Sequence, residues 1–406
     1  MGPLAGIRVL DLSRILAGPW CTQALSDLGA EVIKVERPGV GDDTRAWGPP
    51  FVRTPAGEDT PDSAYFMATN RGKRSITLDI STPDGQAVAR RLAAVCDVAI
   101  ENYKHGDMKR YGLDYDSLAA VNPRLVYCSI TGFGQTGPYR ERAGYDFMIQ
   151  GMGGLMSVTG ERDDLPGGGP QKCGVPIADM MTGMYSALAI VSAIHERTTS
   201  GRGQYIDMAL LDTQVSWLAN QNLNYLVSGE VPKRWGNAHP NLTPYQAFPT
   251  ADGNLILAIG NDGQFRRFCQ VAGLDGVAAD ARFVDNRSRL ANRPALVEIV
   301  AGAIRTKTTA QWMDALEAVG VPCGPINTVK DVFEDPQVRH RGLRFSLPHP
   351  RAGTVPQVAN PIRYSRTDIE YHAAPPTLGQ HTDEVLGGLL GMDAGEIESL
   401  RARGVL

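Results

Sequence analysis

The stretch Ile7-Arg8-Val9-Leu10-Asp11-Leu12 is a short β-rich run, and Glu31-Val32-Ile33-Lys34-Val35-Glu36 is a second one, one helix-length segment further on. Between the two runs, Gly18-Pro19 marks a turn, a helical stretch continues to Leu28, and Gly29 ends it. Two strands connected through a helix are parallel neighbours of one sheet. This unit therefore predicts an α/β fold.

The same alternation continues along the chain. Further strands are expected at 75–80, 95–101 and 124–130, with helices at 83–94 and 115–121. Right-handed crossovers between such strands produce a doubly wound parallel sheet covered by helices on both faces. After Asp179, residues 180–194 are apolar nearly all round and predict a buried helix, too short for a membrane, and 204–211 resumes as a strand.

A change of character near 225–250 indicates a second, smaller α+β domain. Residues 245–250 and 254–259 flank Ala251-Asp252-Gly253, which is a hairpin signal. Helical patterns follow at 264–272, 294–306 and 309–319, and a last helix is expected from about His381.

Composition limits the class of protein. The 406 residues carry 40 Lys and Arg against 44 Asp and Glu, a net charge of −4, with 43% hydrophobic and 21% charged residues. This balance argues against nucleic acid and against membranes as partners. The N-terminal sequence shows no secretory signal, and six scattered cysteines are expected to be buried thiols in a cytoplasmic protein. No metal-ligand spacing is apparent.

A dinucleotide site is the first function to test. Glu36 closes the second strand, where dinucleotide-binding folds place a ribose-binding carboxylate. The turn at 13–19, however, lacks the glycines that let the backbone approach a pyrophosphate, and Pro19 removes a donor. A dehydrogenase is therefore disfavoured, and Glu36 is equally well read as a solvated residue at the end of a strand.

Asp179 is the second candidate. It ends Gly174-Val175-Pro176-Ile177-Ala178-Asp179, directly before the apolar helical segment. An aspartate in this place is usually an N-cap. The two roles are compatible, because an ionised carboxylate in a confined site is also a nucleophile for an activated acyl group.

A third candidate is a set of cationic and amide side chains near strand ends. Their forked and ammonium groups suit a phosphorylated ligand, although exposed Arg and Lys are mostly just solvated. The set comprises Arg37, Lys73, Arg74, Asn102, Lys104 and Arg110.

Several motifs resemble those of the class III CoA-transferases, the family of formyl-CoA transferase, carnitine CoA-transferase and α-methylacyl-CoA racemase. The resemblance runs in order through the whole chain and is highly specific. Its motifs lie at Leu10–Pro19, Asp27–Glu36, Asn70–Ser75, Glu101–Tyr103, Ser129–Gly134, Gly174–Asp179 with Gly183, Gly201–Gln204, Gly320–Pro325 and Leu378–Thr382.

The resemblance implies that Asp179 is the nucleophile and forms an aspartyl-CoA thioester during CoA transfer. It implies an acyl-CoA substrate and no permanently bound cofactor or metal. The positions that match the family's CoA contacts are Ile15, Leu16, Ala17, Arg37, Leu78, Asn102, Tyr103, Lys104 and Arg110, with Tyr145 and Asp146 in a loop expected near the nucleophile.

Two departures separate the branches of the family. The racemase branch has Gly-His-Asp where this chain has Gly144-Tyr145-Asp146, and a tyrosine is a poor base near neutral pH. A 2-methylacyl-CoA racemase is therefore the alternative rather than the leading interpretation. Leu16 stands where formyl-CoA transferase has a glutamine, and that enzyme's glycine run is missing, which argues against an oxalate and formate pair.

The segment 236–248 resembles the branch that uses succinyl-CoA and dicarboxylic acids such as glutarate. A dicarboxylate needs a partner for its distal carboxylate, and Arg14, His239 and Gln246 are hypotheses for that role. A packed or solvent-facing loop histidine is as good a reading of His239. A CoA-binding protein without turnover is a further reading, against which the intact Asp179 motif argues.

The family fold implies an interlocked homodimer with a large Rossmann-like domain built from both ends of each chain. The expected boundaries are 1–214 for the N-terminal part of this domain, 215–244 for a linker, 245–325 for the small α+β domain, and 326–406 for a linker and the C-terminal part that completes the large domain.

Overall fold

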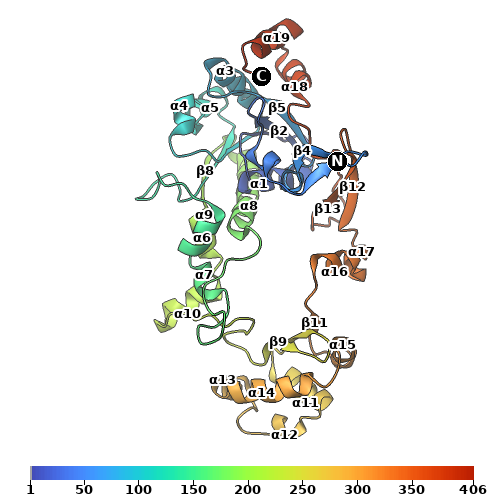
Figure 1. Cartoon of the computed structure of the whole chain (residues 1–406). Coiled ribbons are helices and arrows are strands. Elements are labelled where there is room, and N and C mark those ends of the chain that lie inside the picture. The colour runs from blue at the N-terminus through green and yellow to red at the C-terminus, as the bar shows by residue number, and fades with distance from the viewer. Residues whose placement is uncertain (1) are drawn as a thin grey trace. The chain divides into compact units, whose positions relative to one another are not determined.

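In the computed structural model, which describes residues 2–406, the chain forms two compact units. The first unit contains the residues up to Leu155, Cys173–Leu223 and Gln337–Leu406. The second contains Met156–Lys172 and Asn224–Pro336. The N-terminal and C-terminal parts of the chain therefore share one unit, where their blue and red elements lie together (Figure 1).

The first unit is built around a six-stranded sheet. Its order is β5-β2-β1-β6-β7-β8, and every neighbouring pair is parallel. The sheet confirms the α/β prediction, since these strands are the apolar runs of the sequence. Their bounds are β1 (Arg8–Asp11), β2 (Glu31–Glu36), β5 (Lys73–Thr77), β6 (Val98–Glu101), β7 (Val126–Thr131) and β8 (Tyr205–Ala209).

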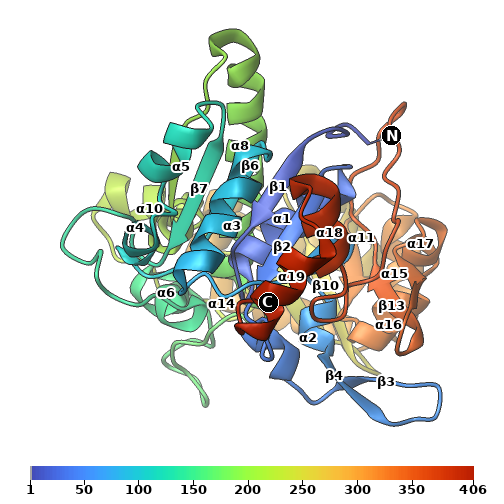
Figure 2. The ribbon, with the colours of Figure 1, turned by 90° about the horizontal axis from the view of Figure 1, so that it is seen from above.

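Helices cover both faces of the sheet and enclose two apolar clusters (Figure 2). Leu10, Ile33 and Ile76 point into one cluster, whereas Val9 and Val32 point into the other, as the period of two requires. The first face carries α3 (Pro83–Ala94), α4 (Asp107–Tyr111), α5 (Tyr115–Val121), α18 (Thr382–Leu390) and α19 (Ala394–Ala402). The second carries α1 (Ala17–Asp27), α6 (Asp146–Met152), α8 (Ile177–Ser200) and α9 (Leu210–Ser216).

The edge strand β5 is closed by the C-terminal part of the chain. The backbone N–H of His381 donates to the carbonyl of Ser75 at 2.9 Å, and the N–H of Thr77 donates to Thr382 Oγ1 at 3.1 Å. Beyond Thr77, the N–H of Asp79 donates to the carbonyl of Val405 at 2.8 Å. This last contact draws the chain away from the sheet, so the strand ends at Thr77 and not at residue 80 as expected.

Shorter elements surround this core in the first unit. The two-stranded sheet β12–β13 packs through Leu347 and Val355 on Phe66 and Met67. The elements concerned are η1 (Asp43–Ala46), β3 (Phe51–Arg53), β4 (Asp59–Ser63), α2 (Ala64–Met67), β12 (Arg344–His349) and β13 (Gly353–Val358). Three helices lie at the boundaries of the two units: α7 (Leu155–Val158), α10 (Asn220–Ser228) and α17 (Pro336–His340).

The second unit is an α+β body with its own core of Phe, Leu, Ile and Val side chains around Trp312. Its antiparallel sheet has the order β11-β10-β9, and the hairpin expected around 251–253 is confirmed. The strands are β9 (Tyr245–Pro249), β10 (Asn254–Ala258) and β11 (Cys323–Pro325), and the helices are α11 (Asp262–Ala272), α12 (Asp275–Ala278), α13 (Asn286–Ala291), α14 (Arg293–Ile304), α15 (Thr309–Glu317) and α16 (Val329–Glu334).

Residues 156–172, which the sequence analysis assigns to the large domain, lie with the second unit. Polar contacts fix them there. Arg234 donates to the carbonyl of Ser157 at 3.1 Å and pairs with Asp163, and the N–H of Gly236 donates to the carbonyl of Gly160 at 3.1 Å. The segment has no apolar periodicity, so nothing in its sequence indicates these partners.

Helix α8 is longer and less buried than expected. It begins at Ile177 and has 24 residues, and Met184 and Leu188 on one side are 41% and 62% exposed. Its other side packs on α1, α6, α9 and the sheet. By length and composition this helix alone, within residues 2–406, meets the test for a membrane span, a test that core helices of soluble proteins also pass.

The contact between α8 and α1 generates a stability prediction. A β-carbon at Gly183 would lie 2.6 Å from the carbonyl oxygen of Ala17, which is backbone and cannot move aside. We expect Gly183→Ala to lower the free energy of unfolding by about 1–3 kcal/mol, measured as a lower Tm. Gly388→Ala in α18 is the control, because nothing lies within 4 Å of that β-carbon; it should leave Tm unchanged or raise it. Equal effects of the two substitutions would contradict the packing described.

Candidate active site

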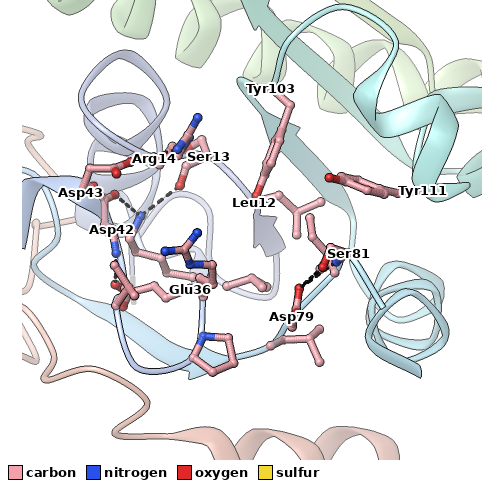
Figure 3. A pocket seen from close by; sticks show the side chains of 18 of the residues that line it. Leu12, Ser13, Arg14, Glu36, Asp42, Asp43, Asp79, Ser81, Tyr103 and Tyr111 are labelled. Carbon is pink, nitrogen blue, oxygen red and sulfur yellow. Dashed lines mark hydrogen bonds and ion pairs between the residues drawn. The ribbon is translucent and has the colours of Figure 1, made fainter. Parts of the chain in front are cut away.

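A cavity of about 670 Å³ opens at the carboxyl ends of β1, β2, β5 and β6 (Figure 3). It lies where the strand order reverses between β1 and β6, which is the usual ligand position in such sheets. Tyr103 and Tyr111 stand on one side of it, and Asp42 and Asp43 on the other. The cavity is large enough for a sizeable part of a nucleotide-like ligand.

Four of the nine positions matched to CoA contacts line this cavity: Arg37, Leu78, Tyr103 and Lys104. Asn102 instead holds the neighbouring loop, since its Oδ1 accepts the N–H of Arg14 at 2.9 Å and its Nδ2 donates to the Arg14 carbonyl at 2.6 Å.

Arg110 also lies at this edge without lining the cavity itself. Its guanidinium is 3.0 Å from a carboxylate oxygen of Asp107 and 3.0 Å from the hydroxyl of Tyr111, and both of these residues do line the cavity.

The loop of residues 13–17 carries the remaining matched positions, Ile15, Leu16 and Ala17. Ile15 has a φ of 71°, a left-handed conformation that a β-branched residue adopts only when its surroundings impose it. The imposing group is Asp42, whose two carboxylate oxygens each lie 3.2 Å from the N–H of Ile15.

Asp42 is itself fixed by a buried lysine. Lys34 Nζ lies 2.9 Å from Asp42 Oδ2 and donates to the carbonyl of Ser13 at 3.0 Å, with both charged side chains fully buried. Burial alone would raise the pKa of Asp42, but the ammonium of Lys34 and the hydrogen bonds from Thr44 bring this pKa below its usual value. Asp42 therefore stays ionised and keeps its hold on Ile15.

Lys73, a second buried lysine, does not have the phosphate-binding role that the sequence suggested for the cationic and amide side chains near strand ends. Lys73 donates to Asp11, to the carbonyl of Pro19 and to Asn70 Oδ1, and burial lowers its pKa to about 8. It is thus a structural residue and neither solvated nor available to a phosphate. Arg74 is likewise occupied, because it pairs with Glu31 and Glu384.

Both interpretations of Glu36 were wrong. Its side chain is buried, and its carboxylate pairs with Arg45 through two contacts of 2.7 Å. It also accepts hydrogen bonds from the Ser75 hydroxyl at 2.6 Å and the N–H of Asp42 at 2.9 Å. The carboxylate is neither solvated nor open to a ribose.

The sequence suggested that Asp179 is the N-cap of the apolar helix, but it is the third residue of α8. The N-cap position is Pro176, which makes no side-chain bond to the helix end. The open N–H groups donate instead to Asp146 Oδ1 of α6, at 2.8 Å from Ala178 and 3.3 Å from Asp179. The carboxylate of Asp179 thus remains free of a capping role.

The surroundings of Asp179 weaken its acidity. Burial, and then the charge of Asp146, raise its pKa to about 7. Tyr65 of α2 belongs to the same neighbourhood, because burial and the charges of Asp179 and Asp146 raise the pKa of its phenol to about 12. A half-buried carboxylate with little hydrogen bonding is a stronger nucleophile than a solvated one.

Asp179 does not line the large cavity, but the loop of residues 13–17 connects the two places. Ser13 and Arg14 line the cavity at one end of this loop. At the other end, Ala17 contacts α8 at Gly183, one turn after Asp179. The nucleophile and the cavity thus share one loop.

The residues suggested for a distal carboxylate lie in different units. Arg14 lines the large cavity, where it pairs with Asp43 at 3.0 Å and stacks over Tyr103. His239 and Gln246 belong to the second unit. The ring of His239 packs at a tilt against Tyr245, and its Nδ1 accepts the N–H of Asn241 at 3.0 Å. Tyr145 is 63% exposed at the start of α6.

Four residues of this site escaped the sequence analysis: Lys34, Asp42, Tyr65 and Gln150. Lys34 carries a usable signal, because a lysine inside a strand that is apolar on both faces must have a buried partner. Asp42 precedes Asp43-Thr44 in a capping pattern, and its side chain does accept the N–H of Thr44. Tyr65 carries no local signal, since its role depends on contacts far along the chain. Gln150 donates to Asp146 Oδ2 at 2.6 Å, a spacing of four residues in one helix that could have indicated the pair, whereas its contact with the N–H of Cys173 could not be foreseen.

Comparison with known proteins extends these observations. A model of CoA-transferase family III matches residues 4–382. The chain is 53% identical to a succinate–glutarate CoA-transferase of Agrobacterium fabrum over 95% of this chain and 96% of that one. It is 42% identical to a succinyl-CoA:glutarate CoA-transferase of Homo sapiens, covering 100% of this chain and 90% of that one.

A solved structure agrees with this assignment. The crystal structure of a CAIB/BAIF family protein from Brucella suis superimposes with a TM-score of 0.84 at 52% identity, covering 96% of this chain and 99% of that one. The family match over residues 4–382 includes the sheet, the loop of residues 13–17 and the helix that carries Asp179. The chain therefore belongs to CoA-transferase family III and is an enzyme of the CoA-transferase type.

Proposed function

We propose that this enzyme transfers CoA from succinyl-CoA to a dicarboxylic acid such as glutarate, through a covalent intermediate on Asp179. The observation that carries the proposal is the half-buried carboxylate of Asp179. Burial and the charge of Asp146 raise its pKa to about 7, and it lies one helical turn before Gly183, where α8 meets the loop that borders the cavity. The glutarate-specific names of the similar proteins support the choice of acids.

The reaction needs only acyl exchange. An oxygen of Asp179 attacks the thioester carbonyl of succinyl-CoA, the C–S bond breaks, and the CoA thiolate leaves behind a succinyl–aspartyl anhydride. The thiolate then attacks the aspartyl carbonyl, which releases succinate and forms an aspartyl-CoA thioester. Every intermediate stays activated, so the energy of the thioester is conserved.

The second half repeats these steps in reverse order. A carboxylate of the acceptor attacks the aspartyl carbonyl and displaces the CoA thiolate, which gives a new anhydride. The thiolate attacks the acceptor's carbonyl carbon, and the new acyl-CoA leaves while Asp179 regains its carboxylate. No proton or electron is gained or lost overall. Water must stay out, because it would hydrolyse the anhydride.

We assign the large cavity to CoA. Arg37 and Lys104 offer cationic groups for its phosphates, with Arg110 at the rim, while Leu78 and Tyr103 offer apolar surface. The pantetheine arm would follow the loop of residues 14–17 toward Asp179. Arg14 beside the cavity, and His239 or Gln246 in the second unit, remain separate candidates for binding the acceptor's distal carboxylate.

We also propose that the enzyme is an interlocked homodimer of the cytoplasm. A second copy would cover apolar side chains that are exposed in one chain, among them Phe147, Leu188 and Trp217 at 60%, 62% and 46%. The six cysteines are free thiols, which suits a reducing compartment. One chain has a mass of 43.7 kDa, and light scattering should give twice this value.

The first prediction concerns the nucleophile. Asp179→Asn should reduce the formation of glutaryl-CoA from succinyl-CoA and glutarate by at least about 1,000-fold, because an amide cannot form the anhydride. Mass spectrometry of the acyl-CoA products measures this, and hydroxylamine should convert Asp179 of the working wild-type enzyme into a hydroxamate. Asp116→Asn, an exposed residue of α5, is the control. Full activity of Asp179→Asn, or exchange of an α-proton faster than CoA transfer, would refute the proposal.

The second prediction concerns pH. Asp179 must be ionised to attack, and its pKa is raised to about 7, so kcat/KM should fall as the pH drops below 7 and level off above it. Because the native state holds this proton more tightly than the unfolded chain, the group costs stability increasingly from pH 4 to 7. The Tm of Asp179→Asn relative to wild type should therefore rise over that interval. A constant difference in Tm would show that the carboxyl is not perturbed.

The third prediction concerns the cavity. Arg37→Ala should raise KM for succinyl-CoA about tenfold and leave kcat within about twofold, because the lost contact would be made equally in the ground state and transition state. Steady-state kinetics at saturating glutarate give both constants. Arg53→Ala, whose side chain is 72% exposed and pairs only at the surface with Asp59, is the matched control. An unchanged KM would contradict the assignment of CoA to this cavity.

A further inference from the structure

The first turn of α8 depends on α6 for its capping. Pro176 offers no side-chain acceptor, and Asp146 Oδ1 receives the N–H groups of Ala178 and Asp179 at 2.8 Å and 3.3 Å. These are backbone atoms of the residue that carries the nucleophile and of its neighbour. The position of the Asp179 backbone thus follows the position of the Asp146 side chain.

Gln150, one turn further along α6, fixes that side chain. It is completely buried, and its Nε2 donates to Asp146 Oδ2 at 2.6 Å. Its Oε1 accepts the N–H of Cys173 at 2.8 Å, and Nε2 also lies 3.5 Å from the carbonyl of Val175. The N–H of Cys173 requires an oxygen opposite it, so the amide has one orientation and presents its NH₂ to Asp146.

We propose that Asp146 and Gln150 are positioning residues for the reaction at Asp179, holding the segment 173–179 and the nucleophile in the geometry of attack. The inference rests on the proposed role of Asp179. It gives a task to Asp146, which the resemblance places near the nucleophile, and both of its oxygens are used within the protein. Displacement of a nucleophile by about 1 Å is enough to lower a rate about 100-fold.

The hydrogen-bond polarity of the pair allows a swap experiment. Gln150→Glu places a carboxylate against Asp146, and Asp146→Asn places an NH₂ group against the NH₂ of Gln150, so each single variant opposes like groups. In the double variant, the side chain at position 150 is an acceptor only. Its carboxylate receives both the N–H of Cys173 and the new amide at position 146, while the oxygen of that amide still accepts the N–H of Ala178.

Each single variant should lower kcat at least about 30-fold while KM for succinyl-CoA stays within about threefold. The double variant D146N/Q150E should recover kcat to within about fivefold of wild type. Its acid limb should lie at lower pH, because the negative charge moves from position 146, whose Oδ1 faces the backbone of Asp179, to position 150 behind it. The loss of kcat at a constant KM, and its recovery in the double variant, distinguish positioning from a role in stability alone. A double variant as slow as the product of the two single effects would overturn the inference.

Gln23→Glu is the matched control. Gln23 is also a buried amide that bridges a backbone N–H, of Arg71, and a carbonyl, of Ala68, each at 3.0 Å. It should lower Tm but leave kcat unchanged. Should the single variants fail to fold, the double variant decides: recovered activity supports the pairing, and an inactive or unfolded double variant refutes it.

The two proposals fail in different ways. If Asp179→Asn keeps its activity, the nucleophile assignment fails whatever the swap gives. If Asp179 is essential and both single variants work at the wild-type rate, only the positioning role fails.

Discussion

Two lysines buried completely in a parallel sheet hold together the edge of the sheet at which the large cavity opens. Lys34 of β2 is bound to Asp42 and to the carbonyl of Ser13, and Lys73 of β5 to Asp11, with all four charged side chains withdrawn from water. Such charges are tolerated only because each is paired and hydrogen-bonded, and removing one partner of a buried pair typically costs about 3–5 kcal/mol. Breaking either ion pair would therefore destabilise this edge of the sheet.

Carboxylates also hold the backbone in two places, the loop of residues 13–17 and the first turn of α8. Asp11 and Asp42 hold the N–H groups of Ser13 and Ile15, so the loop beside the cavity is formed before any ligand arrives. Asp146 does the same for the first turn of α8. Asp42 and Asp146 come from other elements and satisfy donors that the local sequence leaves open, whereas Asp11 binds the N–H of Ser13 two residues later. Preorganisation of this kind lowers the entropy lost on binding.

The fold followed from patterns that act over a few residues. The strand Glu31–Glu36 and the helix Pro83–Ala94 were expected with the bounds they have, because apolar runs and Gly or Pro breaks define both ends. The resemblance to the CoA-transferases identified Asp179. Its local role was misjudged, since an aspartate before a helix is usually its own cap and nothing near it reveals that Asp146, 33 residues earlier, has taken that place. Glu36 was misjudged for the same reason, as Arg45 and Ser75 are not predictable from its strand.

Strand β5 illustrates what discontinuity along the chain means for assembly. Its outer edge is occupied by residues about 300 positions later, through the bonds of Ser75 and Thr77 to the segment that includes His381 and Thr382. Until that segment arrives, the outermost strand of an otherwise finished sheet keeps unpaired donors and acceptors, the condition under which sheets join their neighbours. A nascent chain must therefore carry an unprotected edge while the whole second unit is being made. Whether it aggregates depends on how soon the C-terminal segment covers β5 as well as on the stability of the finished fold.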